Sequence, residues 1–397
     1  MNIVKLFLIT TLFSIIIGQL IRFPLASTAG AITLTDILVI VTDILFLLYA
    51  ILLKSIIRLP KKTFFYGMMF SLAALTSTIL AANFFSFSQI ITASFFLFRF
   101  VAYFFISVVV YNIIKKNQIG NWINFLLLLA VVFSSLGFLQ LLILPDLSFL
   151  VAYGWDPHQE RIVSTFLDPN FAGIAFAIFL AFSTSLYLYK KNYIYLGIAI
   201  LLLFVLVFTY SRSSYLALIT VMFVIGVAKA PKLIILTLLF FLTSVLVSAH
   251  IRERIVGAAT LDETAQARVE SWQKALTIFK NNFLFGTGFN TYRFAQSKQG
   301  NFAYDNPQGG HSGSGTDSSI LLVAATTGIF GLSFFSLLIF SILQFSFHNL
   351  KTNYLKLASF SSILAILVHS QFVNSFFFPQ IMLLIWFIVG INHVQNN

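Results

Sequence analysis

The chain has 397 residues, of which 59% are hydrophobic and only 9% are charged. Soluble domains carry about 25% charged residues, so this composition excludes a soluble protein and indicates one embedded in membrane lipid. The net charge of +12 does not indicate a nucleic-acid partner, because the hydropathy argues against one and the positions of the basic residues explain the charge better. Cysteine is absent, which excludes disulfide and thiolate chemistry.

Apolar runs long enough to cross a bilayer recur along the whole chain. They predict an all-α polytopic membrane protein with about a dozen transmembrane helices. Lys5 alone precedes the first run, so we expect an uncleaved helix there and not a signal peptide. The predicted spans are residues 3–21, 31–53, 63–82, 90–114, 122–144, 171–189, 193–209, 214–228, 233–250, 318–342, 354–373 and 376–394.

Basic residues assign the two faces of this bundle. Alternate connections carry Lys and one Arg but no acidic residue, which places those connections and both termini in the cytoplasm. The opposite face mixes acidic residues with Arg, whose planar fork of donors suits phosphate better than the point charge of Lys. We therefore expect a phosphate-bearing ligand at the outer face. The cytoplasmic basic residues are Lys5, Lys54, Arg58, Lys61, Lys62, Lys115, Lys116, Lys190, Lys191, Lys229, Lys232, Lys351 and Lys356.

Residues 1–397 are interpreted as a single transmembrane domain with a large outer loop, 251–316, between the ninth and tenth spans. Thr260-Leu-Asp-Glu263 has the pattern of a capping box and predicts the start of an amphipathic helix in this loop. Arg268 and Trp272 share one face of that helix. Glycines at Gly286-Thr-Gly288 end it.

Three charged residues lie inside predicted spans. Arg99 is near the middle of the fourth span, and Asp36 and Asp43 share one face of the second. A charge in the bilayer centre is costly, so Arg99 either pairs with Asp36 or Asp43 or forms a charged cavity wall with them. Both interpretations can hold together.

The outer connections contain further candidates, each with a plain structural alternative. Arg161 and Arg212 are either ligand-binding residues or solvated and interfacial charges. Asp317 either caps the tenth span or acts as a general base, and His311 is either a solvated loop residue or the base itself. The segment from Asp168 to Asn170 has turn and helix-start chemistry.

Taken in order, these motifs resemble the O-antigen ligase and O-antigen polymerase family of bacterial envelope enzymes. The resemblance covers about residues 155–332 together with the twelve-span plan and the large outer loop. The motifs that carry it are Arg161…Asp168-Pro-Asn170, Thr209-x-Ser-Arg212, Arg268-x-x-x-Trp272, Gly286-x-Gly-x-Asn290…Tyr292 and Asp317…Gly328-x-x-Gly331.

The resemblance implies a GT-C-like membrane glycosyltransferase in the bacterial cytoplasmic membrane. Its donor would be an undecaprenyl-diphosphate-linked glycan, transferred with inversion to a hydroxyl of a glycan or lipid acceptor. Arg161, Arg212 and Arg268 would bind the diphosphate. Ligases of the family have a His at the position where this chain has Asp317, and this difference leans toward a polymerase. His311 lies six residues earlier, so the choice of base between Asp317 and His311 stays open.

We expect no metal and no cofactor. The sequence has no Asp-x-Asp pair, no zinc pattern and no phosphate-binding glycine loop. The alternative function is a transporter or flippase of lipid-linked glycans, since many spans and intramembrane charges suit that class as well. Transporters usually have two similar halves, and no such symmetry is evident in this chain.

Overall fold

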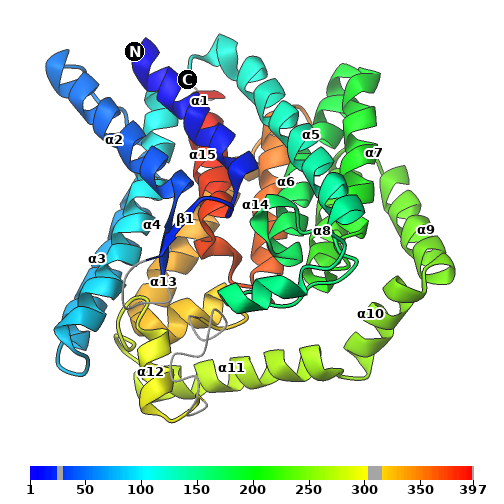
Figure 1. Ribbon diagram of the computed structural model, residues 1–397. Coiled ribbons are helices and arrows are strands. Elements are labelled where there is room, and N and C mark those ends of the chain that lie inside the picture. Colours follow the sequence, from blue (N-terminus) through cyan, green and yellow to red (C-terminus); the bar gives the residue numbers. More distant parts are fainter. Residues whose placement is uncertain (25–29, 303–314, 396–397) are drawn as a thin grey trace.

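The computed structural model describes residues 1–24, 30–302 and 315–395. The described residues are mostly helical, with one small antiparallel hairpin of β1 (Arg22–Pro24) and β2 (Ala31–Thr33). Most helices lie side by side as a bundle, and both termini lie at the same end of it (Figure 1). One helix, α11 (Glu263–Asn281), lies across the opposite end.

Every predicted apolar span is a helix in the structure, with ends that shift by a few residues. In the described chain, six helices are long and apolar enough to cross a membrane, and five apolar helices of 10–17 residues are shorter. The helices are α1 (Asn2–Ile17), α2 (Leu34–Leu52), α3 (Lys61–Ala81), α4 (Phe87–Ile113), α5 (Ile119–Ile143), α6 (Pro169–Lys190), α7 (Tyr193–Val207), α8 (Arg212–Ala228), α9 (Lys232–Val247), α13 (Ser319–Phe347), α14 (Tyr354–His369) and α15 (Pro379–Gln395).

The described part of the long loop contains three helices, α10 (Ala249–Ala259), α11 and α12 (Tyr292–Lys298). α9 and α10 meet at a bend of 103°, and together they are long and apolar enough to cross a membrane. The predicted capping box at Thr260 is wrong. Thr260 ends α10 and donates its hydroxyl to the Val256 carbonyl, whereas Asp262 caps α11 by accepting a 3.0 Å hydrogen bond from the Ala265 amide.

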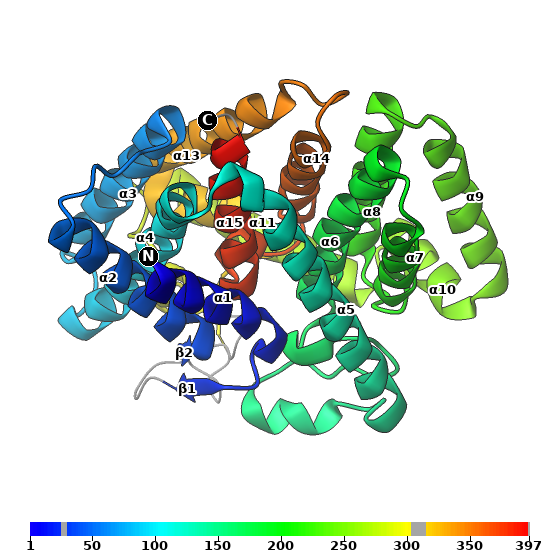
Figure 2. The same ribbon diagram turned by 90° about the horizontal axis from the view of Figure 1, so that it is seen from above.

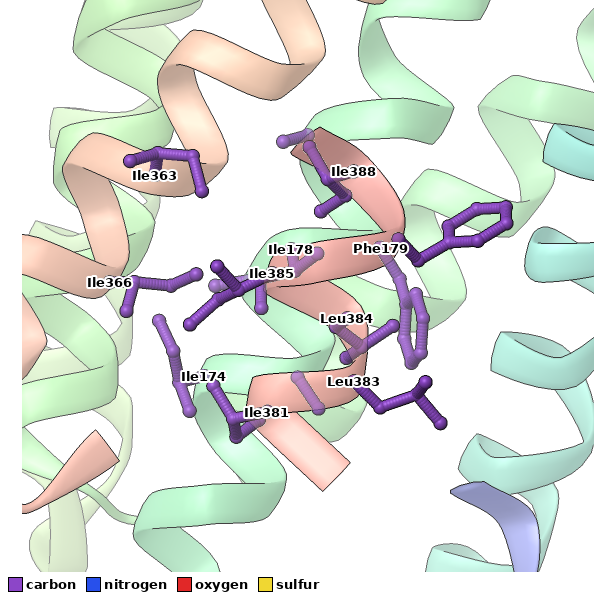
Figure 3. Packing of buried hydrophobic residues seen from close by; sticks show 14 of the residues in the cluster. Ile174, Ile178, Phe179, Ile363, Ile366, Ile381, Leu383, Leu384, Ile385 and Ile388 are labelled. Carbon is purple, nitrogen blue, oxygen red and sulfur yellow. The ribbon is translucent and has the colours of Figure 1, made fainter. Parts of the chain in front are cut away.

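The core of the bundle is formed by helices that are buried on all sides. Nearly every residue of α15 and of the middle of α6 is buried. α15 packs on α4, while α14 packs on α6 and α8. Figure 3 shows part of this interior, and its labelled side chains include Ile178 and Phe179 of α6, Ile366 of α14 and Ile385 of α15. Helices that are apolar all round are expected to occupy such central positions, and Figure 2 shows α15 surrounded by other helices.

A backbone junction fixes the long loop to the bundle. α13 breaks at Gly328, where φ is 64° and ψ is −166°, a conformation that is essentially restricted to glycine. Amides of Thr287 and Gly288 donate to the Ala325 and Thr326 carbonyls at 3.1 and 2.9 Å, and the Ile329 amide donates to Phe283 at 2.8 Å. We call residues 283–288 and 325–329 the glycine junction. It explains Gly286 and Gly328, where a side chain would meet the backbone of the opposite segment, and it holds the end of α11 against α13.

Candidate active site

A cavity of about 900 Å³ opens among β1, α4, the loop before α6, α11, α12 and the start of α13. Its walls come from segments that are far apart in the sequence, and α11 places it at the end of the bundle away from the termini (Figure 1). Charges of both signs line it, mixed with polar and aromatic side chains. The charged lining residues are Arg22, Arg99, Arg268, Lys274, Arg293, Asp156, Asp168, Glu270 and Asp317.

Asp317 is held in this cavity through its backbone. The indole of Trp272 donates to the Asp317 carbonyl at 3.0 Å, and the Asp317 amide donates to the Ser271 hydroxyl at 3.0 Å. The N-cap of α13 is Ser318, whose hydroxyl accepts from the Leu321 amide, so the predicted capping role of Asp317 is wrong. Its carboxylate is therefore available to the cavity.

The surroundings of Asp317 favour its neutral form. Burial raises the pKa of this carboxyl above its ordinary value, and the charges of Asp156 and Asp168 add to the rise. Arg268 opposes it, but the net direction is upward. A carboxylate with a raised pKa is a stronger proton acceptor than an ordinary aspartate, which is what a general base requires.

Arg268 faces the same cavity from α11, one turn before Trp272. Burial lowers its pKa, and the negative charge of Asp317 partly restores it. The Trp272 and Ser271 contacts that fix Asp317 also fix this part of α11. The structure thus brings two sequence-predicted residues, Arg268 and Asp317, together in one cavity.

Arg161 does not line the cavity. Its guanidinium donates to the Thr209 and Tyr210 carbonyls at 2.8 and 3.2 Å, which ties the loop before α6 to the turn before α8. Burial, with the nearby charge of Arg254, lowers its pKa to about 10. In this arrangement Arg161 shapes the wall and adds positive charge to it.

Arg212 also stands outside the lining residues. As the first residue of α8, it forms a two-pronged ion pair with Asp262, the N-cap of α11, with Nη1 3.0 Å from Oδ1 and Nη2 bonded to Oδ2. This pair joins the starts of α8 and α11. Its charge acts on Arg268, whose pKa it helps to lower.

The pairing of Arg99 is settled by geometry. Arg99 contacts Asp36 at 2.8 Å and the Ala31 carbonyl at 2.6 Å, which confirms the predicted pair with Asp36, and Arg99 lines the cavity without either aspartate. Asp43 is buried elsewhere on α2, is not paired with Arg99 and does not line the cavity. His311 lies outside the described residues.

A buried polar network beneath the cavity was not predicted. His369, at the end of α14, lies 2.6 Å from the Ser375 hydroxyl through Nδ1 and 3.1 Å from the Ser213 hydroxyl through Nε2. The adjacent Ser211 donates to the side chain of Asn170, which lines the cavity. A histidine inside a predicted apolar span is the signal that sequence reasoning passed over. Ser271, Asp262, Arg22 and Trp155 were missed as well, because their partners are distant in the sequence.

A family model described as O-antigen ligase matches residues 197–336 of this chain. The match spans Arg212, Arg268 and Asp317 and includes the glycine junction. It supports assignment to the O-antigen ligase and polymerase family and covers the motifs from Thr209 to Gly331, but it does not extend to the motif from Arg161 to Asn170. No curated protein matches the chain. The match and the apolar helices together make this a membrane protein of polysaccharide biosynthesis.

Proposed function

We propose that this protein is an inverting glycosyltransferase that acts on an undecaprenyl-diphosphate-linked glycan at the outer face of the bacterial cytoplasmic membrane. The observation that carries the proposal is the meeting of Arg268 and Asp317 in one large cavity, both on segments matched by the O-antigen ligase family model. A cationic fork beside a carboxylate of raised pKa supplies the two groups that this transfer needs.

In the proposed step, an acceptor hydroxyl attacks the anomeric carbon of the donor sugar from the face opposite the diphosphate. The new carbon–oxygen bond forms as the bond to the diphosphate oxygen breaks, and the lipid diphosphate leaves. Asp317 accepts the hydroxyl proton. Arg268 stabilises the negative charge that develops on the leaving diphosphate. Arg161 adds positive charge to the wall, and Arg212 holds the start of α11 through its ion pair with Asp262. No metal or cofactor enters this scheme.

The proposed topology is twelve spans in one transmembrane domain of GT-C-like architecture, with both termini in the cytoplasm and the loop 251–316 outside. Lys-rich connections support the orientation, and the two termini at one end of the bundle fit an even number of crossings (Figure 1). The acceptor is a glycan in a polymerase or a lipid-borne core in a ligase. Asp317 at the position where ligases carry a His favours polymerase.

The test uses the full-length protein reconstituted in vesicles with a lipid-linked oligosaccharide donor. Arg268→Ala should abolish release of the lipid diphosphate, and Arg268→Lys should rescue poorly, because an ammonium cannot reproduce a two-pronged contact. Arg252→Gln is the matched control, since Arg252 is exposed on α10 and does not line the cavity. Donor flipping without bond cleavage by the wild type would instead assign the protein to transport.

A further inference from the structure

A second pair of cations lines the cavity and has no part in the proposed transfer step. Arg22 belongs to β1 and Arg99 to α4, whereas Arg268 and Asp317 belong to α11 and the segment before α13. The positive charge of Arg99 acts on Arg22, while Arg268 is acted on by Asp317, Arg212, Asp168 and Asp262. The cavity therefore contains two separate groups of interacting charges.

The hairpin and two helices hold this second pair in place. Arg22 pairs with Thr33 across the antiparallel strands, and Thr33 caps α2 in a reciprocal capping box with Asp36. Arg99 then bonds to Asp36 and to the Ala31 carbonyl of β2. Helix capping and the β2 carbonyl thus hold the Arg99 guanidinium, whereas strand pairing fixes the backbone of Arg22 and the Trp155 ring lies against its guanidinium.

The charges of this wall do not balance. Asp36 already accepts from the Thr33 amide at 2.7 Å, from Arg99 at 2.8 Å and from the Tyr103 hydroxyl at 2.9 Å. Within the described residues, no carboxylate lies within ion-pair distance of Arg22, whose guanidinium lies 4.8 Å from the centre of the Trp155 ring. Asp36 thus balances the charge of Arg99, whereas Arg22 contacts an aromatic ring and has no carboxylate partner within the described residues. An uncompensated cation in such a site is costly unless an anionic ligand completes it.

The neighbouring lining suits a sugar. Ser88, Thr92 and Phe96 lie on the cavity side of α4 at intervals of four residues, with Arg99 one turn further on. Such spacing places them in one stripe along the helix. Two hydroxyls and an aromatic ring leading to a cation can bind the hydroxyls, the apolar face and the acidic group of a glycan.

We propose that Arg22 and Arg99 form a second anion subsite, which binds an acidic group of the acceptor glycan while Arg268 faces the donor diphosphate. The shared chemistry of the ligand is an anionic oxygen group on a sugar, from either a carboxylate or a phosphate substituent. The assignment to the acceptor rests on the proposed transfer reaction. The existence of a second anion subsite does not.

The experiment measures equilibrium binding to the full-length protein in nanodiscs by calorimetry and by tryptophan fluorescence, because Trp155 lies directly under Arg22. The probes are glucuronate, glucose 1-phosphate and neutral glucose for the second subsite, and geranylgeranyl diphosphate for the Arg268 subsite. Arg22→Gln should weaken the binding of the acidic sugars about tenfold or more and change the affinity for the prenyl diphosphate less than twofold. Arg268→Ala should do the reverse, and Arg252→Gln should leave all probes unchanged.

Whichever acidic sugar binds more tightly, and loses more in Arg22→Gln, identifies the carboxylate or the phosphate as the preferred group. Arg22→Lys keeps the charge and should retain part of the affinity, which separates loss of charge from loss of fold. Equal binding of glucose and both acidic sugars to the wild type would overturn the inference. Loss of acidic-sugar binding in Arg268→Ala but not in Arg22→Gln would overturn it too. If Arg268→Ala keeps full affinity for the prenyl diphosphate, the proposed diphosphate site at Arg268 is refuted. The Arg22 subsite is then still accepted or rejected by the acidic-sugar binding of Arg22→Gln.

Discussion

Replacing Gly328 with alanine perturbs the glycine junction at its tightest point. The backbone angles of Gly328 fall in a region that costs a side-chain-bearing residue about 1–3 kcal/mol. A Cβ there would also lie 2.3 Å from the Leu284 carbonyl oxygen and 2.5 Å from the Phe285 nitrogen. Both are backbone atoms, so the two segments must separate.

Separation would weaken the hydrogen bonds of Thr287, Gly288 and Ile329 across the junction, each worth about 0.5–1.5 kcal/mol net. Together with the backbone strain, we expect Gly328→Ala to destabilise the protein by about 3–5 kcal/mol. Gly197→Ala is the matched control, because Gly197 lies within α7 and a Cβ added there meets nothing within 4 Å.

The assay is thermal unfolding in detergent, followed by tryptophan fluorescence, together with binding of geranylgeranyl diphosphate. Gly328→Ala should melt several degrees below the wild type and bind the prenyl diphosphate more weakly, because α11 and Arg268 lose their anchor. Gly197→Ala should melt at or slightly above the wild-type temperature. A Gly328→Ala protein with wild-type melting and wild-type binding would refute the role assigned to the glycine junction.

Three further predictions concern charges and topology. Arg99→Met alone should destabilise the protein, because it leaves Asp36 as a buried charge without its ion-pair partner. The double variant Arg99→Met/Asp36→Asn should recover the melting temperature. A single variant as stable as the double variant would contradict the pair. Asp262→Asn and Arg212→Gln should reduce activity to a similar extent, and the double variant should lose little more than either single variant, because one ion pair joins α8 to α11. Fully additive losses in the double variant would show that Arg212 acts independently of Asp262. In this cysteine-free chain, a cysteine placed at the exposed Ser297 should react with an impermeant thiol reagent on intact cells. A cysteine at the exposed Asn117 should not react. Labelling of Asn117 from outside would reverse the proposed orientation.

Much of the fold follows from the sequence because long apolar runs can only be helices in a membrane. The same uniformity hides their burial. The runs that became α6 and α15 look as apolar as the rest, and their central positions depend on helix packing that no periodicity reveals. The start of α11 was placed at Thr260 and not at Asp262, because the sequence does not show that α10 uses Thr260 for its own end.

The candidate site was only partly accessible to sequence reasoning. Arg268 and Asp317 stood out as charges beside apolar segments, and the structure brings them into one cavity. That Arg212 pairs with Asp262 could not be foreseen, because the partners are fifty residues apart and meet only after α8 and α11 are placed. His369 was hidden for a different reason, since a lone histidine in an apolar run reveals nothing of the serines that surround it.

The central claim is that Asp317 accepts the proton of the attacking hydroxyl. Burial raises the pKa of Asp317 in the folded protein above its value in the unfolded chain. The folded protein is therefore most stable when Asp317 is protonated, and it loses that stability as the pH rises through the folded-state pKa. At neutral pH the ionised carboxylate destabilises the folded protein. Asp317→Asn should therefore melt at or above the wild-type temperature near neutral pH.

The most direct measurement is kcat/KM for lipid diphosphate release against pH, for wild type and Asp317→Asn in the same vesicles. The wild type should lose activity on acidification with an apparent pKa above that of an ordinary aspartate. Asp317→Asn should lose about 10²–10⁴-fold in kcat, keep its affinity for the prenyl diphosphate and show no such acid limb. Normal turnover of Asp317→Asn, with loss of turnover in His311→Ala, would contradict the account and assign the proton to His311.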